Sequence, residues 1–120
     1  MAVKDLRASA EWYNRVLGFK SEGIHFVVLR DEDGQIVLCL HPWKMDGHPS
    51  MMDPEITPGN GIILYFKTNR YKEIYQNVRG MGFEIEEELH KNLRSGKMEF
   101  SLRDPDGYFI IITEYHEYEG

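Results

Sequence analysis

Three polar residues alternate along one predicted strand and could act together in chemistry. Glu99, Ser101 and Arg103 stand two positions apart within residues 97–103, and alternate residues of a strand point to the same face. A carboxylate can serve as a general base, and an arginine can hold an anion through paired hydrogen bonds. The spacing predicts a base beside an anion clamp; the alternative is a polar face that contacts water.

A histidine is the second catalytic candidate. His25 opens a predicted strand, residues 25–30, and strand alternation places it on the same face as Val27 and Leu29. There it could contact a ligand and act as a base, because imidazole titrates near neutral pH. The alternative is a structural histidine on an apolar face. His25 and Glu99 are therefore the catalytic candidates.

The elements that must position these residues occur twice along the chain. Residues 5–18 and 69–81 have the apolar spacing of amphipathic helices, and a Gly-Phe pair stands at the end of each, as Gly18-Phe19 and Gly82-Phe83. Asp5 is suited to capping the first helix, and Gly18 to ending it in the left-handed conformation. Strands are predicted around these helices at 25–30, 35–41, 61–67, 83–89, 97–103 and 108–115.

An internal repeat supports this plan. Residues 29–34 (LRDEDG) and 102–107 (LRDPDG) match at five of six positions, and both lie at predicted hairpin turns. We therefore predict a single α+β domain, residues 1–120, built from two tandem βαβββ modules that form a cleft. The modules are residues 1–41 and 61–120, and only Met1 to Val3 remain for the first strand. That strand is either a stub or begins upstream of Met1.

The segment between the modules has a different composition. Residues 42–60 hold four of the five prolines and three of the six methionines. Irregular connections of this length are often functional or mobile. The segment could be a lid, a hinge or a plain linker.

Two motifs at opposite ends of the chain resemble one known superfamily. VKDLRASAEWYNRVLGF near the start and FSLRDPDGYFIIITE near the end resemble the opening and closing signatures of the vicinal-oxygen-chelate superfamily, which contains glyoxalases, bleomycin-resistance proteins and dioxygenases. The resemblance covers nearly the whole chain. It implies two modules facing each other across a cleft, and members that often pair as homodimers. It does not choose an activity, because one fold hosts many.

The resemblance also implies where a divalent metal would bind. Metal-dependent members supply one His or Glu ligand from the first and last strand of each module. The first ligand position falls before Met1, and the other three fall at Leu38, Ile62 and Ile111. Aliphatic side chains donate no lone pair, so a cation there would lose its hydration without compensation. We therefore predict no metal and no other cofactor, with a divalent metal as the alternative.

Strand alternation predicts a mostly apolar lining for the cleft, with polar groups on one wall. Such a surface is typical of a small-molecule pocket, although its side chains could also simply fill the space. The predicted ligand-binding residues are His25, Val27, Leu38, Leu40, Trp43, Ile62, Leu64, Phe66, Glu99, Ser101, Arg103, Ile111 and Thr113.

Composition narrows the classes of partner. A net charge of −6 with scattered lysines and arginines argues against nucleic-acid binding. No apolar stretch approaches membrane-spanning length, and the start lacks the pattern of a secretory signal. Cys39 is the single cysteine, which excludes an intramolecular disulfide and favours a cytoplasmic location. On the strand pattern it should face the helices as a small core residue.

Three hypotheses for function follow. The first is a metal-free protein that binds an apolar or aromatic small molecule in the cleft, as bleomycin-resistance proteins do. The second is a metal-dependent enzyme with non-standard ligands, resembling glyoxalase I lyases or extradiol dioxygenases. The third is a homodimeric interaction protein whose cleft is filled.

Overall fold

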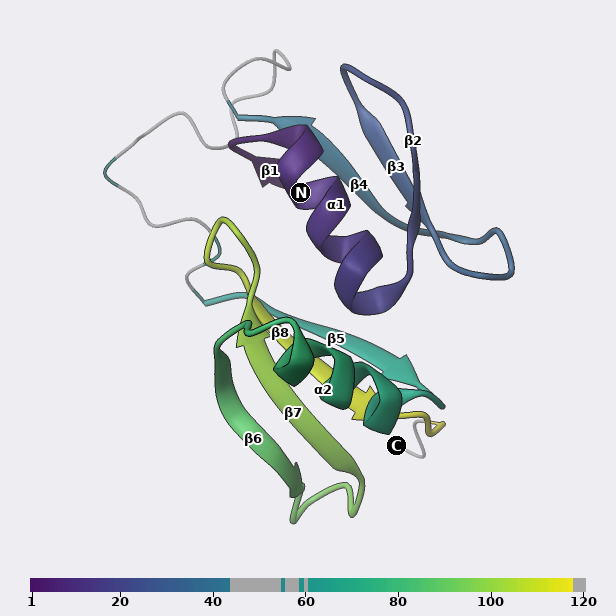
Figure 1. Ribbon diagram of the computed structural model, residues 1–120, viewed down its shortest axis with the longest axis vertical. Coiled ribbons are helices and arrows are strands. Elements are labelled where there is room, and N and C mark those ends of the chain that lie inside the picture. Colours follow the sequence, from purple (N-terminus) through teal and green to yellow (C-terminus); the bar gives the residue numbers. More distant parts are fainter. Residues whose placement is uncertain (44–54, 56–58, 60, 118–120) are drawn as a thin grey trace. The chain divides into compact units, whose positions relative to one another are not determined.

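The chain divides into two compact units, each with one helix and one four-stranded sheet (Figure 1). The computed structural model describes residues 1–43, 55, 59 and 61–117. The units span Met1–Pro58 and Gly59–Gly120, and each is described by itself. Most of the predicted connection, residues 42–60, lies outside the described residues.

The first unit has a sheet of order β1-β4-β3-β2. The short β1 runs parallel to β4, and the other neighbours are antiparallel. The elements are β1 (Ala2–Val3), α1 (Leu6–Leu17), β2 (Lys20–Glu22), β3 (Val27–Arg30) and β4 (Ile36–Pro42).

The second unit repeats this topology, with the order β5-β8-β7-β6 and β5 parallel to β8. The prediction of two βαβββ modules in an α+β fold is confirmed, and so is the short first strand. The elements are β5 (Ile63–Thr68), α2 (Tyr71–Gly80), β6 (Ile85–Lys91), β7 (Met98–Arg103) and β8 (Phe109–Glu114).

Helix α1 begins and ends as its sequence predicts. Asp5 is extended, and its carboxylate Oδ1 accepts a hydrogen bond from the Ala8 amide at 3.0 Å. Gly18 takes a φ of 75° and donates its N–H to the Asn14 carbonyl oxygen at 2.8 Å. The helix buries Tyr13 and Val16. Its placement is therefore determined by local capping and by one apolar face.

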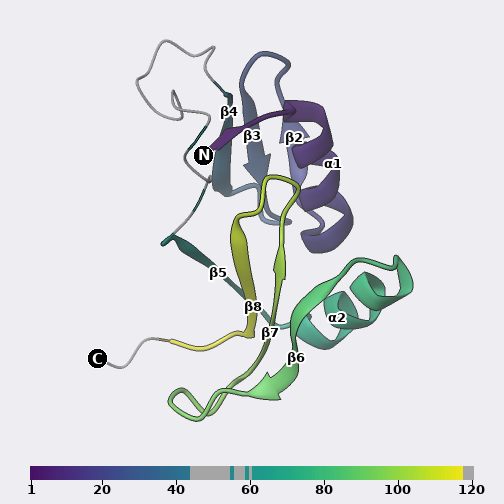
Figure 2. The same ribbon diagram turned by 90° about the vertical axis from the view of Figure 1, so that its left-hand side faces the viewer.

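Helix α2 lacks such a side-chain cap at its start. It lies against one face of the second sheet (Figure 2) and buries Ile74 and Val78. Tyr75 extends the contact, since its ring meets that of Phe100 on β7 edge to face, with centroids 5.1 Å apart. Phe100 therefore identifies the side of β7 that faces the helix.

The two matching turns have the same hydrogen bonds. Asp31 Oδ1 accepts from the amides of Asp33 and Gln35, and Asp104 Oδ1 accepts from those of Asp106 and Tyr108. Arg30 and Arg103 each donate from Nη1 to a turn carbonyl oxygen, of Gly34 and Gly107 respectively, at 3.0 Å in both units. The repeat in the sequence is therefore also a repeat in the structure of the turns.

The strands after these turns differ in register. In the second unit Arg103 pairs with Phe109 and Leu102 with Ile110, without interruption. In the first unit Arg30 pairs with Ile36, but Leu29 pairs with Leu38, so β4 carries one extra residue. A bulge of this kind turns every later side chain to the opposite face.

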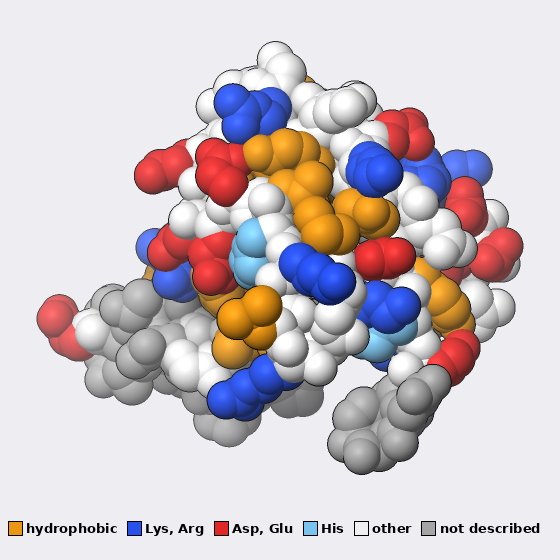
Figure 3. All heavy atoms as spheres, turned by 90° about the horizontal axis from the view of Figure 1, so that it is seen from below, with side chains coloured by type: hydrophobic (Ala, Val, Ile, Leu, Met, Phe, Trp, Pro, Cys, Tyr) orange, Lys and Arg blue, Asp and Glu red, His pale blue; other side chains and the backbone are white. Residues whose placement is uncertain are grey.

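No helix among the described residues is both long and apolar enough to cross a membrane. On the face that Figure 3 shows, acidic and basic side chains are interspersed, and neither sign of charge gathers in one area.

Candidate functional site

The candidate site is the side of the second sheet opposite α2, here called the helix-free face. Because Phe100 faces the helix, its neighbours Glu99 and Ser101 face the other way. Cross-strand pairing places Thr113 beside Glu99 and Ile111 beside Ser101. The remaining residues of the face on β5, β7 and β8 are Ile63, Tyr65, Lys67, Arg103 and Phe109.

Polar groups at the centre of this face are buried. Glu99, Ser101 and Thr113 are 8%, 1% and 2% exposed, beside an equally buried Ile111. A buried carboxylate needs partners, because removing it from water otherwise costs several kcal/mol. The structure supplies them from within the unit.

Glu99 is held by the end of β6 and the loop that follows. Asn92 donates from Nδ2 to Glu99 Oε1 at 2.6 Å, and His90 Nε2 lies 3.6 Å from the same oxygen. Asn92 is itself oriented, since its Oδ1 accepts from the amides of Arg94 and Ser95. Such a connected network fixes a side chain more firmly than one bond. Glu99 is therefore a pre-oriented acceptor.

Ser101 and Arg103 also have acidic partners on β6. Ser101 donates from Oγ to Glu87 Oε1 at 2.8 Å. Arg103 donates from Nε and Nη2 to the carboxylate of Glu86, at 3.0 and 3.4 Å, and its guanidinium lies 4.9 Å from the centre of the Phe109 ring. An anion bound by Arg103 would have to compete with Glu86. This pairing disfavours the capture of an anion on this face.

The divalent metal that the resemblance implies does not fit these residues. Ile111, at the position where the resemblance implies a ligand, is aliphatic and buried. Among the described residues no three His, Cys, Asp or Glu side chains are grouped so that they could hold a metal ion. The donor set that such an ion requires is therefore missing from this face.

Several predicted lining residues lie on the other side of their sheets. Leu64 and Phe66 pair with Ile110 and Ile112, and Ile112 in turn pairs with Phe100 on the helix side. Leu64 and Phe66, which were predicted to line the cleft, therefore lie on the helix side of the second sheet. Ile63 and Tyr65 lie on the helix-free face instead, and Ile62 is an exposed residue just before β5.

In the first unit, too, predicted lining residues lie on the helix side of their sheet. Val27 lines a pocket with residues of α1, so its side of β3 faces that helix. Val27 pairs with Leu40, and Leu29 pairs with Leu38, so these side chains belong to the packing between helix and sheet. For Leu38 and Leu40 the reason is the bulge after Ile36, which turns the later β4 side chains to the helix side.

The structure also places three further residues that the sequence analysis singled out, His25, Trp43 and Cys39. His25 lies in a bend before β3 and is exposed, so it does not share a strand face with Val27. Trp43 follows β4, and Lys4 Nζ lies 4.9 Å from the centre of its ring. Cys39 pairs with Val28 on the side away from α1, not toward the helix as predicted.

The sequence pattern missed His90, Asn92, Glu86 and Glu87. All four lie on β6 or just after it, and the pairing of β6 with β7 shifts twice, between Ile85 and Glu87 and again before His90. Each shift interrupts the alternation of side chains along β6. The face on which an acidic side chain lies in this stretch therefore cannot be predicted from alternation alone.

A family model for the Glyoxalase/Bleomycin resistance protein/Dioxygenase superfamily matches residues 1–112. The chain belongs to this superfamily. The two βαβββ units and repeated turns of the structure agree with that membership. No curated protein matches the chain.

Solved structures of the same fold cover nearly the whole chain. Virulence protein STM3117 from Salmonella typhimurium is 27% identical with a TM-score of 0.73, and the match covers 97% of this chain and 92% of that one. TioX from Micromonospora sp. ML1 is 19% identical with a TM-score of 0.74, over 97% and 94%. A lactoylglutathione lyase from Agrobacterium tumefaciens is 18% identical with a TM-score of 0.72, over 95% and 88%. Identities this low carry the fold alone.

Proposed function

We propose that the chain is a metal-free small-molecule-binding protein that holds an aromatic or apolar ligand on the helix-free face of its second sheet. The observation that carries the proposal is the buried Glu99, held by Asn92 and His90 beside the aliphatic Ile111. Apolar contact area with a few oriented polar groups is the usual composition of a ligand site. A hydroxyl or amine on the ligand would donate to the Glu99 carboxylate.

Binding accounts for these side chains better than catalysis does. The Ser101 hydroxyl donates to the Glu87 carboxylate, and a carboxylate is a weaker general base than the histidine that commonly activates a serine nucleophile. The lyase and dioxygenase alternatives both need a metal, and the aliphatic Ile111 stands against one. The homodimer stays a prediction that analytical ultracentrifugation would test.

The first experiment is elemental analysis of the purified protein, followed by thermal-shift assays with Ni²⁺, Zn²⁺, Fe²⁺ and Mn²⁺. Specific binding stabilises the native state by mass action. We expect no stoichiometric metal and no selective increase in Tm. A stoichiometric metal, or a rise in Tm with one ion alone, would overturn the proposal in favour of the metal-dependent enzyme.

A fragment screen tests the site itself. Aromatic fragments that carry a hydroxyl or amine should shift the NMR signals of Glu99, Ser101 and Thr113. The Glu99→Gln substitution should weaken binding about tenfold, since a charged hydrogen bond becomes neutral. Glu84→Gln is the matched control, because Glu84 is an exposed carboxylate of the same unit. Equal affinity in both variants would exclude Glu99 from the site.

A further inference from the structure

The buried carboxylate of Glu99 has two side-chain partners within the described residues, and neither carries a fixed positive charge. Asn92 Nδ2 donates to Glu99 Oε1 at 2.6 Å, and His90 Nε2 lies 3.6 Å from the same oxygen. Carboxylates are ordinarily ionised at neutral pH, and a buried charge is usually paired with an opposite one. The cation that would complement this carboxylate is therefore left for a ligand to supply.

The hydrogen bonds of His90 determine which of its ring nitrogens carries the proton. Nδ1 lies 2.7 Å from the carbonyl oxygen of Glu88, and a carbonyl oxygen can only accept, so Nδ1 must be the donor. In the neutral ring Nε2 then has a lone pair. That lone pair and Glu99 Oε1, with 3.6 Å between the two atoms, are neighbouring acceptors. The His90 side chain is 43% exposed, so solvent reaches this pair of acceptors.

Two neighbouring acceptors select for a group that has several protons. An alkylammonium has three N–H bonds and a positive charge, so it can donate to both acceptors and neutralise the carboxylate. A hydroxyl has one proton and serves one acceptor, and a carboxylate anion would be repelled by Glu99. Lys67 on the same face does not fill this role, because it lies two strands away and its Nζ donates to the His116 carbonyl oxygen at 3.1 Å.

The exposed apolar side chains of the helix-free face determine the form of the rest of the ligand. Tyr65 pairs with Ile111 across β5 and β8, and Tyr65 and Ile63 are 57% and 51% exposed. Glu99 lies on β7, on the other side of β8. Because adjacent strands are about 4.8 Å apart, an apolar body roughly 10 Å long extends from Glu99 toward Tyr65. Covering these side chains removes apolar surface from water and stabilises the complex.

We propose that the helix-free face prefers a primary amine with an apolar or aromatic body, its ammonium between Glu99 and His90 and its body against Ile111 and Tyr65. This inference rests on the proposed function of the face and names the chemical class of its ligand. The ammonium supplies the charge that the carboxylate lacks, and the body covers the apolar surface of β5.

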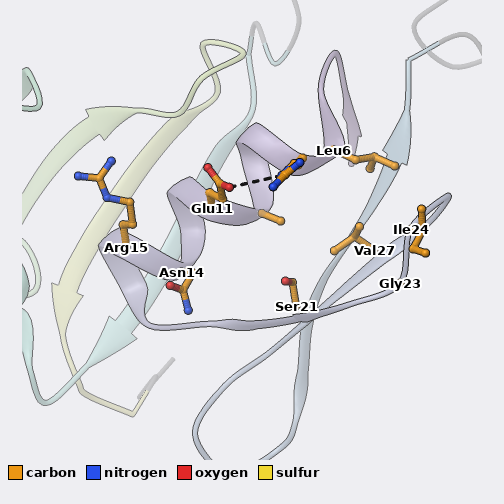
Figure 4. Close-up of a pocket in the computed structure, with 10 residues that line it drawn as sticks. Leu6, Glu11, Asn14, Arg15, Ser21, Gly23, Ile24 and Val27 are labelled. Carbon is orange, nitrogen blue, oxygen red and sulfur yellow. Dashed lines mark ion pairs between the residues drawn. The ribbon is translucent and has the colours of Figure 1, made fainter.

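A pocket of about 500 Å³ between α1 and the segment from β2 into β3 is a competing place for an apolar amine (Figure 4). The acidic residue in its lining is Glu11, which forms an ion pair with Arg7 at 3.6 Å, drawn as a dashed line in Figure 4. An ammonium in this pocket would have to break that pair. We therefore expect the amine at Glu99, and the lining of the pocket, which falls within residues 6–27, serves as a control.

The test ligand is 4-phenylbutylamine, and its matched neutral control is 4-phenylbutan-1-ol, which has a hydroxyl in place of the ammonium. At about pH 8 a primary amine is protonated and imidazole is ordinarily neutral. Titration of the full ¹⁵N-labelled chain should shift the amide signals of Glu99, Ile111 and Thr113 and leave those of residues 6–27 in place. The amine should bind about tenfold more tightly than the alcohol, because it adds a charge and a second hydrogen bond.

Two substitutions and one control complete the experiment. Glu99→Gln should remove the preference for the amine over the alcohol, because the amide carries no charge. His90→Ala should weaken the amine about threefold and leave the alcohol unchanged, since only the ammonium uses the second acceptor. Glu84→Gln removes an exposed carboxylate of the same unit and should change neither affinity, which excludes a general effect of the chain's net charge of −6.

The outcomes distinguish the preference for an amine from the proposed function of the face. If both ligands bind at the helix-free face with equal affinity, or if Glu99→Gln weakens both equally, the preference for an amine is wrong while the binding site stands. If neither ligand shifts a signal of that face, or if the shifts lie within residues 6–27, both proposals are overturned.

Discussion

The two units share a turn but differ in the strand that follows it. Arg30 to Gly34 and Arg103 to Gly107 close with matching hydrogen bonds. One extra residue in β4 then sends Leu40 toward α1, while Thr113, at the equivalent repeat position, lies on the helix-free face of the second sheet. Local sequence can therefore reproduce a turn without reproducing the faces of the strands that it joins.

The largest expected loss of stability comes from a substitution that tests this difference between β4 and β8. Leu40→Ala should lower the free energy of unfolding by about 2–5 kcal/mol, because Leu40 is fully buried in the packing between helix and sheet. Thr113→Ala should cost about 1 kcal/mol, since the lost contact is a single long hydrogen bond from Oγ1 to the Met98 carbonyl oxygen at 3.4 Å. Urea unfolding measures both. Equal losses would mean that the two positions are equivalent after all.

Both turns should lose stability when their aspartate is replaced by alanine. Asp31→Ala and Asp104→Ala each remove a carboxylate that accepts from two backbone amides, and each should cost about 1–3 kcal/mol. The Asp104 substitution should lie at the upper end, because Asp104 is 5% exposed and its amide partners would be left unsatisfied away from water. Urea unfolding midpoints compare the two variants. A negligible loss at both positions would show that the repeated turn has no energetic role.

The helix starts provide a third comparison. Asp5→Ala removes the cap of α1 and should cost about 1 kcal/mol. Asp5→Asn, which keeps the acceptor oxygen, should restore most of that stability. Circular dichroism during thermal unfolding measures both variants, and no difference between alanine and asparagine would contradict the capping role.

The smallest effect concerns the start of α2, where an ion pair stands in place of a side-chain cap. The hydrogen bond and positive charge of Arg70 lower the pKa of Glu73 below its ordinary value of 4.5. A lowered pKa means that this contribution to stability is present above the ordinary value and is lost as pH falls through the folded pKa. An NMR titration should place the Glu73 midpoint below 4.5, and Arg70→Gln should return it to that value. An unchanged midpoint in the variant would exclude Arg70 as the cause.

Much of the fold was determined by the sequence alone. The apolar period, Asp5 and Gly18 define α1, and the repeated turns define the two hairpins, because capping and turn closure depend on residues within one or two turns of each other. The alternation along β7 likewise placed Glu99 and Ser101 on one face, since that strand has an uninterrupted register with β8.

Only the tertiary structure decided which residues surround Glu99 and which side Leu38 and Leu40 face. Those features depend on bulges in β4 and β6, and a bulge arises from pairing with a neighbouring strand, not from the local sequence. Contacts within a few residues were therefore predictable, while strand register and side-chain partners required the folded chain.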